Sequence, residues 1–132
     1  MEDTIIVVQD KIDIKDLQKK AEELYGLMVK SVVDVNQKIL AVGGELHSDA
    51  EQILLEQGSL QENLWGINLY PFETDPKRLI EYDSLINIRP QDNNFSMSIE
   101  NKELRKQVNE VVLSLINFND HQVSSSFNSR KI

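Results

Sequence analysis

The chain contains no cysteine, which excludes a disulfide framework, a thiolate metal site and a cysteine nucleophile. It also lacks any run near the roughly 18 apolar residues of a membrane span. The N-terminus has neither the basic start nor the apolar stretch of about 7–15 residues that a secretory signal needs. We therefore expect a cytoplasmic protein with no membrane partner.

Basic residues are in deficit: 14 Lys and Arg stand against 22 Asp and Glu, for a formal net charge of -8. Such a chain repels the phosphate backbone, so the charge disfavours nucleic acid as a partner. A glycine-rich phosphate loop, an internal repeat and a Ser/His/Asp arrangement are also missing. The remaining composition, 40% hydrophobic and 27% charged, is that of a globular protein.

At 132 residues the chain is long enough for one domain that buries most of its surface without a metal or disulfide. We place this single domain at residues 1–118. Residues 119–132 are rich in Ser and Asn and show no periodicity. They are predicted to form a disordered tail.

Hydrophobic periodicity predicts three helices and five strands. The expected strands are 4–8, 27–35, 39–42, 64–70 and 79–88, and the expected helices are 14–25, 48–57 and 102–117. The clearest local signal is a capping box, with Ser48 as the cap and Glu51 three residues later. The order β-α-β-β-α-β-β-α predicts the α+β class, with a mostly antiparallel sheet and helices packed on it.

The last predicted helix carries a wide apolar stripe. Leu104, Val108, Val111 and Leu115 recur at helical spacing, and Val112 widens the stripe beyond what is needed to cover one sheet face. Such a surface suits a homodimer seam.

One candidate site surrounds His47, the only histidine outside the predicted tail. In an extended segment Glu45 and His47 point the same way, Asp49 follows at the start of the helix, and Asp34 lies on the neighbouring hairpin strand. This pattern suits acid–base catalysis by Glu45 and His47, or a mixed carboxylate and imidazole metal site. The alternative is a histidine that packs beside the helix entry, with carboxylates that serve the helix dipole. Because Glu-x-His is a weak motif, we assign no metal ligand.

A second candidate site combines polar residues that interrupt otherwise apolar strands. Asn68 and Asn87 are expected to become neighbours if strands 64–70 and 79–88 pair. Arg89 lies at a strand end beside the loop that contains Asn94 and Ser96. A guanidinium, amides and loop hydroxyls form a cradle suited to a carboxylate or phosphate.

The alternative for these residues is structural. Buried amides that hydrogen-bond to one another would determine the register of the strands. Arg89 would then pair with an acid such as Asp83 or Glu81.

Four blocks of the sequence resemble a family of small prokaryotic proteins catalogued only as a domain of unknown function. They are residues 28–35, GGELH at 43–47, LWGIN at 64–68 and INIRP at 86–90. The resemblance covers about residues 4–117 and brings no activity, cofactor or partner. In that family the loop after the Arg-Pro step often holds a basic residue, where this chain has Phe95. The resemblance therefore implies weaker anion binding in this member.

Two functions follow from these patterns. The first is a non-catalytic binding or interaction module, because no motif carries a mechanism. The second is a small enzyme or ligand-binding protein for a phosphorylated or carboxylated small molecule. It would act through Glu45, His47, Asn68, Asn87 and Arg89. The sequence identifies no cofactor and no particular ligand, and whether these residues converge in one pocket separates the two functions.

Overall fold

The fold is built on one five-stranded antiparallel sheet, as predicted for the α+β class. The computed structural model describes residues 5–24 and 26–118. The sheet order is β1-β4-β3-β5-β6, with all neighbouring strands antiparallel. The strands are β1 (Ile6–Val8), β3 (Val29–Asp34), β4 (Ile39–Val42), β5 (Leu64–Leu69) and β6 (Ile80–Glu81). A separate parallel pair joins β2 (Ile12–Asp13) to β7 (Ile116–Asn117).

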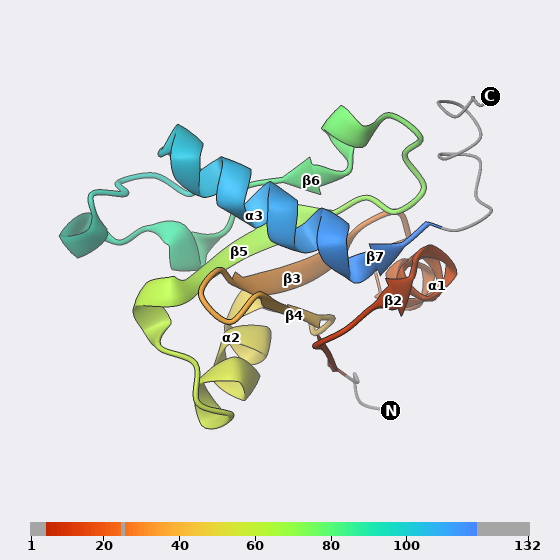
Figure 1. Ribbon diagram of the computed structural model, residues 1–132, viewed down its shortest axis with the longest axis horizontal. Coiled ribbons are helices and arrows are strands. Elements are labelled where there is room, and N and C mark those ends of the chain that lie inside the picture. Colours follow the sequence, from red (N-terminus) through yellow and green to blue (C-terminus); the bar gives the residue numbers. More distant parts are fainter. Residues whose placement is uncertain (1–4, 25, 119–132) are drawn as a thin grey trace.

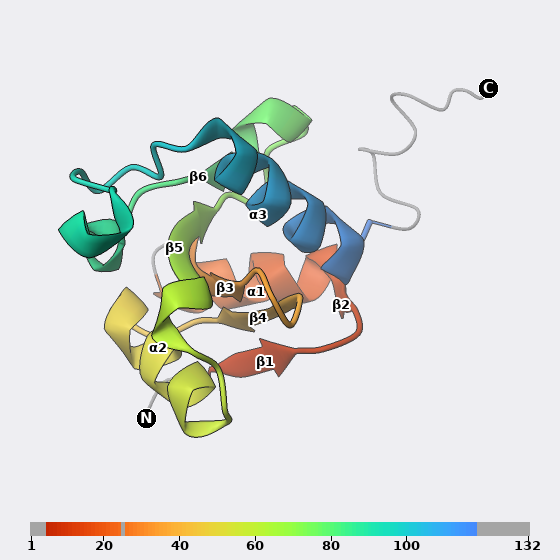
Figure 2. The ribbon, with the colours of Figure 1, turned by 60° about the vertical axis from the view of Figure 1, so that its left-hand side comes forward.

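Three helices cover the two faces of the sheet, and Figures 1 and 2 show them from two directions. Helices α1 (Ile14–Leu24) and α3 (Lys102–Leu115) pack on the face formed by Val29, Val33, Trp65, Ile67 and Leu69. Helix α2 (His47–Glu56) packs on the opposite face, on Val32, Ala41 and Leu64. The strands alternate between these two faces because successive side chains of a strand point in opposite directions.

The N-cap of helix α2 lies two residues earlier than the capping box predicts. Leu46 is the N-cap, and the Asp49 carboxylate accepts a hydrogen bond from the Leu46 backbone N–H at 3.3 Å. His47 is therefore the first residue of the helix, and Ser48 is not the cap. The Asp49 carboxylate, three residues after the cap, satisfies a backbone N–H at the start of the helix, which is the role that the capping box assigned to Glu51.

The predicted strand 79–88 is wrong over most of its length. The strand β6 holds only two residues, and the 3₁₀ turns η3 (Leu85–Asn87) and η4 (Pro90–Asp92) follow it. Ser84 caps η3 by accepting the Ile86 N–H at 3.3 Å. A Cβ at Gly66 would lie 2.5 Å from Ser84 Cβ, so glycine lets this turn pack directly on β5. Alternating apolar residues therefore suggested a strand where tertiary packing forms a turn.

The apolar stripe of α3 is buried within the same chain. Val108, Val111, Val112 and Leu115 are all in the core beneath the sheet, so the stripe that suggested a homodimer seam already has a partner. None of the helices in residues 5–24 and 26–118 combines the length and apolarity that crossing a bilayer requires. The predicted tail 119–132 lies outside the described residues.

Candidate functional site

The first turn of α2 places His47 over the sheet. Its Nε2 lies 2.8 Å from the backbone oxygen of Ile67 on β5, and its side chain is partly buried. A carbonyl can only accept, so Nε2 carries the proton and Nδ1 is the acceptor of the neutral ring. Burial lowers the pKa of His47, the largest effect, and the Lys30 ammonium lowers it further. The Ile67 carbonyl and the neighbouring Asn68 side chain raise the pKa.

Asn68 lies next to His47 on the same sheet face and is 8% exposed. Its Nδ2 donates to Glu81 Oε1 at 2.8 Å and to the Asp83 backbone oxygen at 3.3 Å. Tyr70 Oη donates to the same Glu81 oxygen at 3.1 Å. Burial raises the pKa of Tyr70, as do the hydrogen bond to Glu81 and the negative charges of Glu81 and Asp83.

His47 and Asn68 line a cleft of about 540 Å³ at the N-terminal end of α2. Helix α2 covers Val32 on this sheet face but not the first residues of β3, where Lys30 and Met28 are only partly buried. This uncovered part of the sheet is the floor of the cleft. Its remaining lining residues are Leu46, Ser48, Glu81, Asp83, Ser84, Leu85, Ile86 and Met97.

Three large apolar side chains stand at the edge of this cleft, which we call the apolar rim: Leu46, Leu85 and Met97. They are 56%, 72% and 44% exposed. They come from three separate segments, namely the start of α2, the turn η3 and the loop before α3. Exposed apolar side chains that gather around a concave polar site are typical of binding surfaces.

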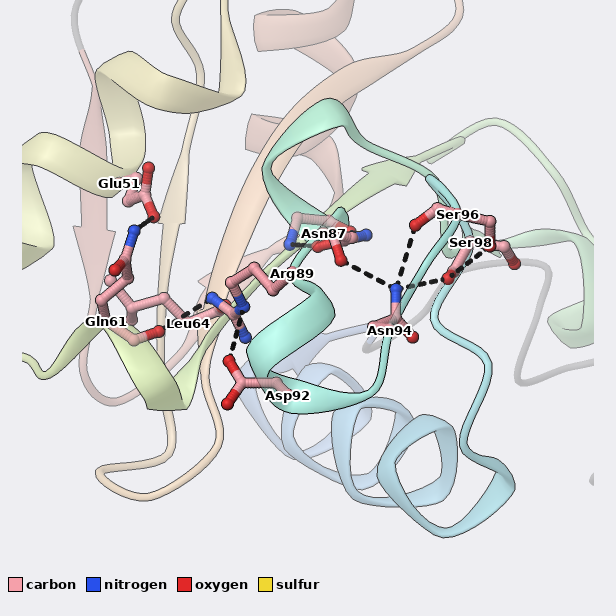
Figure 3. A network of polar contacts seen from close by, with 10 residues as sticks. Glu51, Gln61, Leu64, Asn87, Arg89, Asp92, Asn94, Ser96 and Ser98 are labelled. Atoms are coloured by element: carbon pink, nitrogen blue, oxygen red, sulfur yellow. Dashed lines mark hydrogen bonds and ion pairs between the residues drawn. The ribbon is translucent and has the colours of Figure 1, made fainter.

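Arg89 takes no part in the cleft. Its Nη1 donates to the backbone oxygens of Gln61 and Leu64, both at 2.9 Å, and its Nε lies 3.1 Å from Asp92 Oδ2. The guanidinium carbon is 3.9 Å from the centre of the Trp65 ring. The residue is 4% exposed, and Figure 3 shows its guanidinium between Leu64 and Asp92. Asp92 is thus its acidic partner, rather than the predicted Asp83 or Glu81.

Beyond the end of β6, the Asn87 side chain makes the hydrogen bonds to β5 that a neighbouring strand would otherwise make. Its Oδ1 accepts the Gly66 N–H at 2.8 Å, and its Nδ2 donates to the oxygens of Gly66 and Met97 at 2.9 and 3.0 Å. One amide side chain therefore satisfies both backbone groups of Gly66 on β5. In place of the predicted pairing with Asn68, Asn87 pairs with backbone.

Asn94 closes the loop between η4 and α3 (Figure 3). Its Nδ2 donates to the backbone oxygens of Asn87, Ser96 and Ser98, and its Oδ1 accepts the Glu100 N–H at 2.9 Å. The Ser96 hydroxyl donates to the Ser98 oxygen at 3.2 Å. Asn87, Arg89 and Asn94 therefore form a buried hydrogen-bonded cluster, which is the structural alternative to a ligand site. The cluster holds η3 and η4 against β5.

The structure thus brings together two of the predicted site residues, His47 and Asn68, and separates the others from them. Glu45 does not line the cleft, although its backbone oxygen accepts from Lys30 Nζ at 2.9 Å. In the described part of the chain, no three His, Asp or Glu side chains are placed to hold a metal ion. Sequence reasoning missed Glu81, Asp83 and the rim. Glu81 and Asp83 had been considered only as acidic partners of Arg89.

A family profile described as "Protein of unknown function (DUF5674)" matches residues 6–115. The chain belongs to this family. The match spans both the cleft and the Asn87–Arg89 cluster, so the family's domain includes all of the described site. No curated protein and no solved structure gives a significant match. The resemblance to a family of unknown function is thereby confirmed, and the family description names no activity.

Proposed function

We propose that this DUF5674 protein is a non-catalytic binding module and that the cleft at the start of α2 is its binding surface. One observation carries the proposal: the three exposed side chains of the apolar rim line the same cleft as the polar side chains of His47 and Asn68. Apolar contact supplies affinity in such sites, and a few fixed polar groups supply orientation.

The rigidity of the cleft wall supports the proposal. The segment that carries Leu85 and Met97 is held from behind by Asn87, which bonds to Gly66 and Met97, and by Asn94. A wall fixed in this way loses little conformational entropy when a ligand binds.

Of the residues expected for the enzyme alternative, only His47 and Asn68 lie together in the cleft. That alternative needs Arg89 to hold a phosphorylated or carboxylated substrate, but the Arg89 guanidinium already contacts Gln61, Leu64 and Asp92. Without this cation the acidic cleft offers an anion little attraction.

Nuclear magnetic resonance tests the proposal directly. A ¹H–¹⁵N spectrum of the labelled protein is recorded against a library of fragments and capped tripeptides. We expect the amide signals that shift to be those of His47, Asn68, Leu85 and Met97. Shifts that map elsewhere, or a library without any binder, contradict the proposal.

Two matched variants separate the rim from general apolar exposure. Leu85→Ser removes a rim side chain, whereas Leu60→Ser removes one that is 59% exposed outside the cleft. Leu85→Ser should weaken binding of the best compound and Leu60→Ser should leave it unchanged. Equal effects of the two substitutions would show that the rim has no special role.

A further inference from the structure

Glu81 and Asp83 form a fixed negative end of the cleft. They are two residues apart on extended chain, so their side chains share one side, and both line the cleft. No Lys or Arg within the described ranges forms an ion pair with either carboxylate. Because Asn68 and Tyr70 both donate to Glu81 Oε1, the orientation of this carboxylate is determined before any ligand arrives.

Asn68 adds an acceptor that has no donor. Its Oδ1 is buried and makes no hydrogen bond of good geometry among the described residues, although the Asn68 side chain lies beside His47 and raises the pKa of that ring. A flip of the amide would turn the oxygen toward Glu81 Oε1 and the Asp83 carbonyl, two acceptors, so the present orientation is enforced. A buried acceptor without a partner is destabilising, and a donor in the cleft would relieve this cost.

The neutral ring of His47 adds an acceptor at Nδ1, because the Ile67 carbonyl holds the proton on Nε2. The one cation in the lining, Lys30, lies at the other end. Lys30 pairs with Asn68 across the strands and Asn68 with Glu81, so two strand spacings, about 10 Å, separate the backbone of Lys30 from that of Glu81. Lys30 also donates to the Glu45 backbone oxygen. Of the two ends of the cleft, the one beside β6 therefore carries the negative charge, although Glu81 and Asp83 also border a neighbouring hollow lined by Lys77, Arg78 and Arg105.

We propose that the cleft binds a lysine side chain carried by an apolar segment of a partner protein. The ammonium group lies between the carboxylates of Glu81 and Asp83 and gives Asn68 Oδ1 its missing donor. Lysine suits this end because its three N–H donors radiate from one compact charge. Its methylene stem packs along Leu85, as long cationic side chains do on apolar surface.

The rim and the overall charge explain why the lysine belongs to a protein segment. Leu46, Leu85 and Met97 come from three separate parts of the chain, and the apolar neighbours of the lysine would cover all three. The net charge of -8 attracts a basic partner and accelerates the encounter. This inference rests on the proposed function, since it names the ligand of the same cleft.

The test uses three probes on the full chain and follows them by ¹H–¹⁵N spectra. The peptide Ac-Leu-Lys-Leu-NH₂ carries the ammonium and the apolar flanks, Ac-Leu-Gln-Leu-NH₂ lacks the charge, and n-butylamine lacks the flanks. We expect the lysine peptide to shift cleft signals and to bind about three- to tenfold more tightly than the glutamine peptide, as two partly exposed charge pairs allow. Butylamine should bind more weakly still. Raising NaCl from about 50 to about 300 mM should reduce the preference for lysine.

The variant Glu81→Gln with Asp83→Asn should remove the preference for lysine. The matched control, Glu22→Gln with Glu103→Gln, makes the same change in net charge at exposed helix positions outside the cleft and should keep the preference. If the cleft variant does not fold, the salt dependence of the wild-type protein decides the same question.

The outcomes distinguish this inference from the proposed function. Equal binding of the lysine and glutamine peptides at the cleft overturns the lysine proposal and leaves the binding module in place. Butylamine binding as tightly as the lysine peptide overturns the protein segment in favour of a free amine. If no peptide and no library compound shifts the cleft signals, both proposals fail.

Discussion

Replacing Asn87 with alanine should be among the most damaging single substitutions in this protein. Asn87 is fully buried, and its side chain makes three hydrogen bonds, to the Gly66 N–H, the Gly66 oxygen and the Met97 oxygen. In Asn87→Ala the N–H and the oxygen of Gly66 remain buried and lose this partner, whereas the Met97 oxygen keeps the Ser84 N–H at 3.0 Å. Gly66 also has no strand on this side, because β6 pairs only with Asn68 and Leu69.

The magnitude follows from the two backbone groups of Gly66. Each buried backbone group left without a partner costs about 1–3 kcal/mol, and partial relaxation of the turn reduces the sum. We expect Asn87→Ala to lower the free energy of unfolding by about 2–4 kcal/mol. Since a domain of this kind is stable by about 5–15 kcal/mol, this is a large share of the total.

Urea unfolding followed by fluorescence measures the loss. Trp65 is the only tryptophan of the chain and is buried on β5, next to Gly66. Asn36→Ala is the matched control, because that side chain is exposed in the β3–β4 turn and should change stability little. Asn87→Asp keeps the shape but turns an oxygen toward the two carbonyls, so it should also destabilise the fold. A loss below about 1 kcal/mol in Asn87→Ala would refute the reasoning.

Three further substitutions test neighbouring parts of the same argument. Gly66→Ala should destabilise by about 1–3 kcal/mol, because its Cβ meets Ser84 Cβ at 2.5 Å. In a double-mutant cycle Ser84→Gly should recover part of this loss, and strict additivity would contradict the clash. Arg89→Lys should cost about 1–3 kcal/mol and shift the Trp65 emission, since lysine cannot both stack on the ring and bond to two carbonyls; an unchanged melting temperature would argue against this role. Burial lowers the pKa of His47 below its ordinary 6.5, so its contribution is complete above about pH 6.5 and is lost as the pH falls toward the folded-state pKa. His47→Gln should therefore flatten the stability profile between about pH 7 and pH 5, and a profile identical to that of the wild type would count against it.

The candidate site could be predicted only in part. His47 and Asn68 were identified from the residues around them, one as the only histidine outside the predicted tail and the other as an amide within an apolar strand. That they meet in one cleft depends on where α2 begins above β5, a distance of 20 residues along the chain. Glu81 and Asp83 carried no signal, because acidic residues are common on this chain and only the pairing of Asn68 with Glu81 places them there.

The same limit applies to the cluster behind the cleft. Polar residues in apolar stretches marked Asn87 and Arg89 as unusual, and either a ligand cradle or a buried hydrogen-bonded cluster accounted for the pattern. The structure distinguishes the two because it shows the partners: Gly66 for Asn87, and Leu64, Gln61 and Asp92 for Arg89. Those partners lie 21 to 28 residues away, except Asp92.

By itself, the sequence determined the α+β class and the three helices, because side-chain periodicity is a local property. The tertiary structure decided where strand pairing stops and what replaces it. Residues 79–88 alternate as a strand would, yet the absence of a side chain at Gly66 lets η3 pack directly on β5 and leaves Asn87 to satisfy the edge. The cleft exists for the same kind of reason: α2 covers only part of one sheet face, and no local pattern states how far a helix will extend over a sheet.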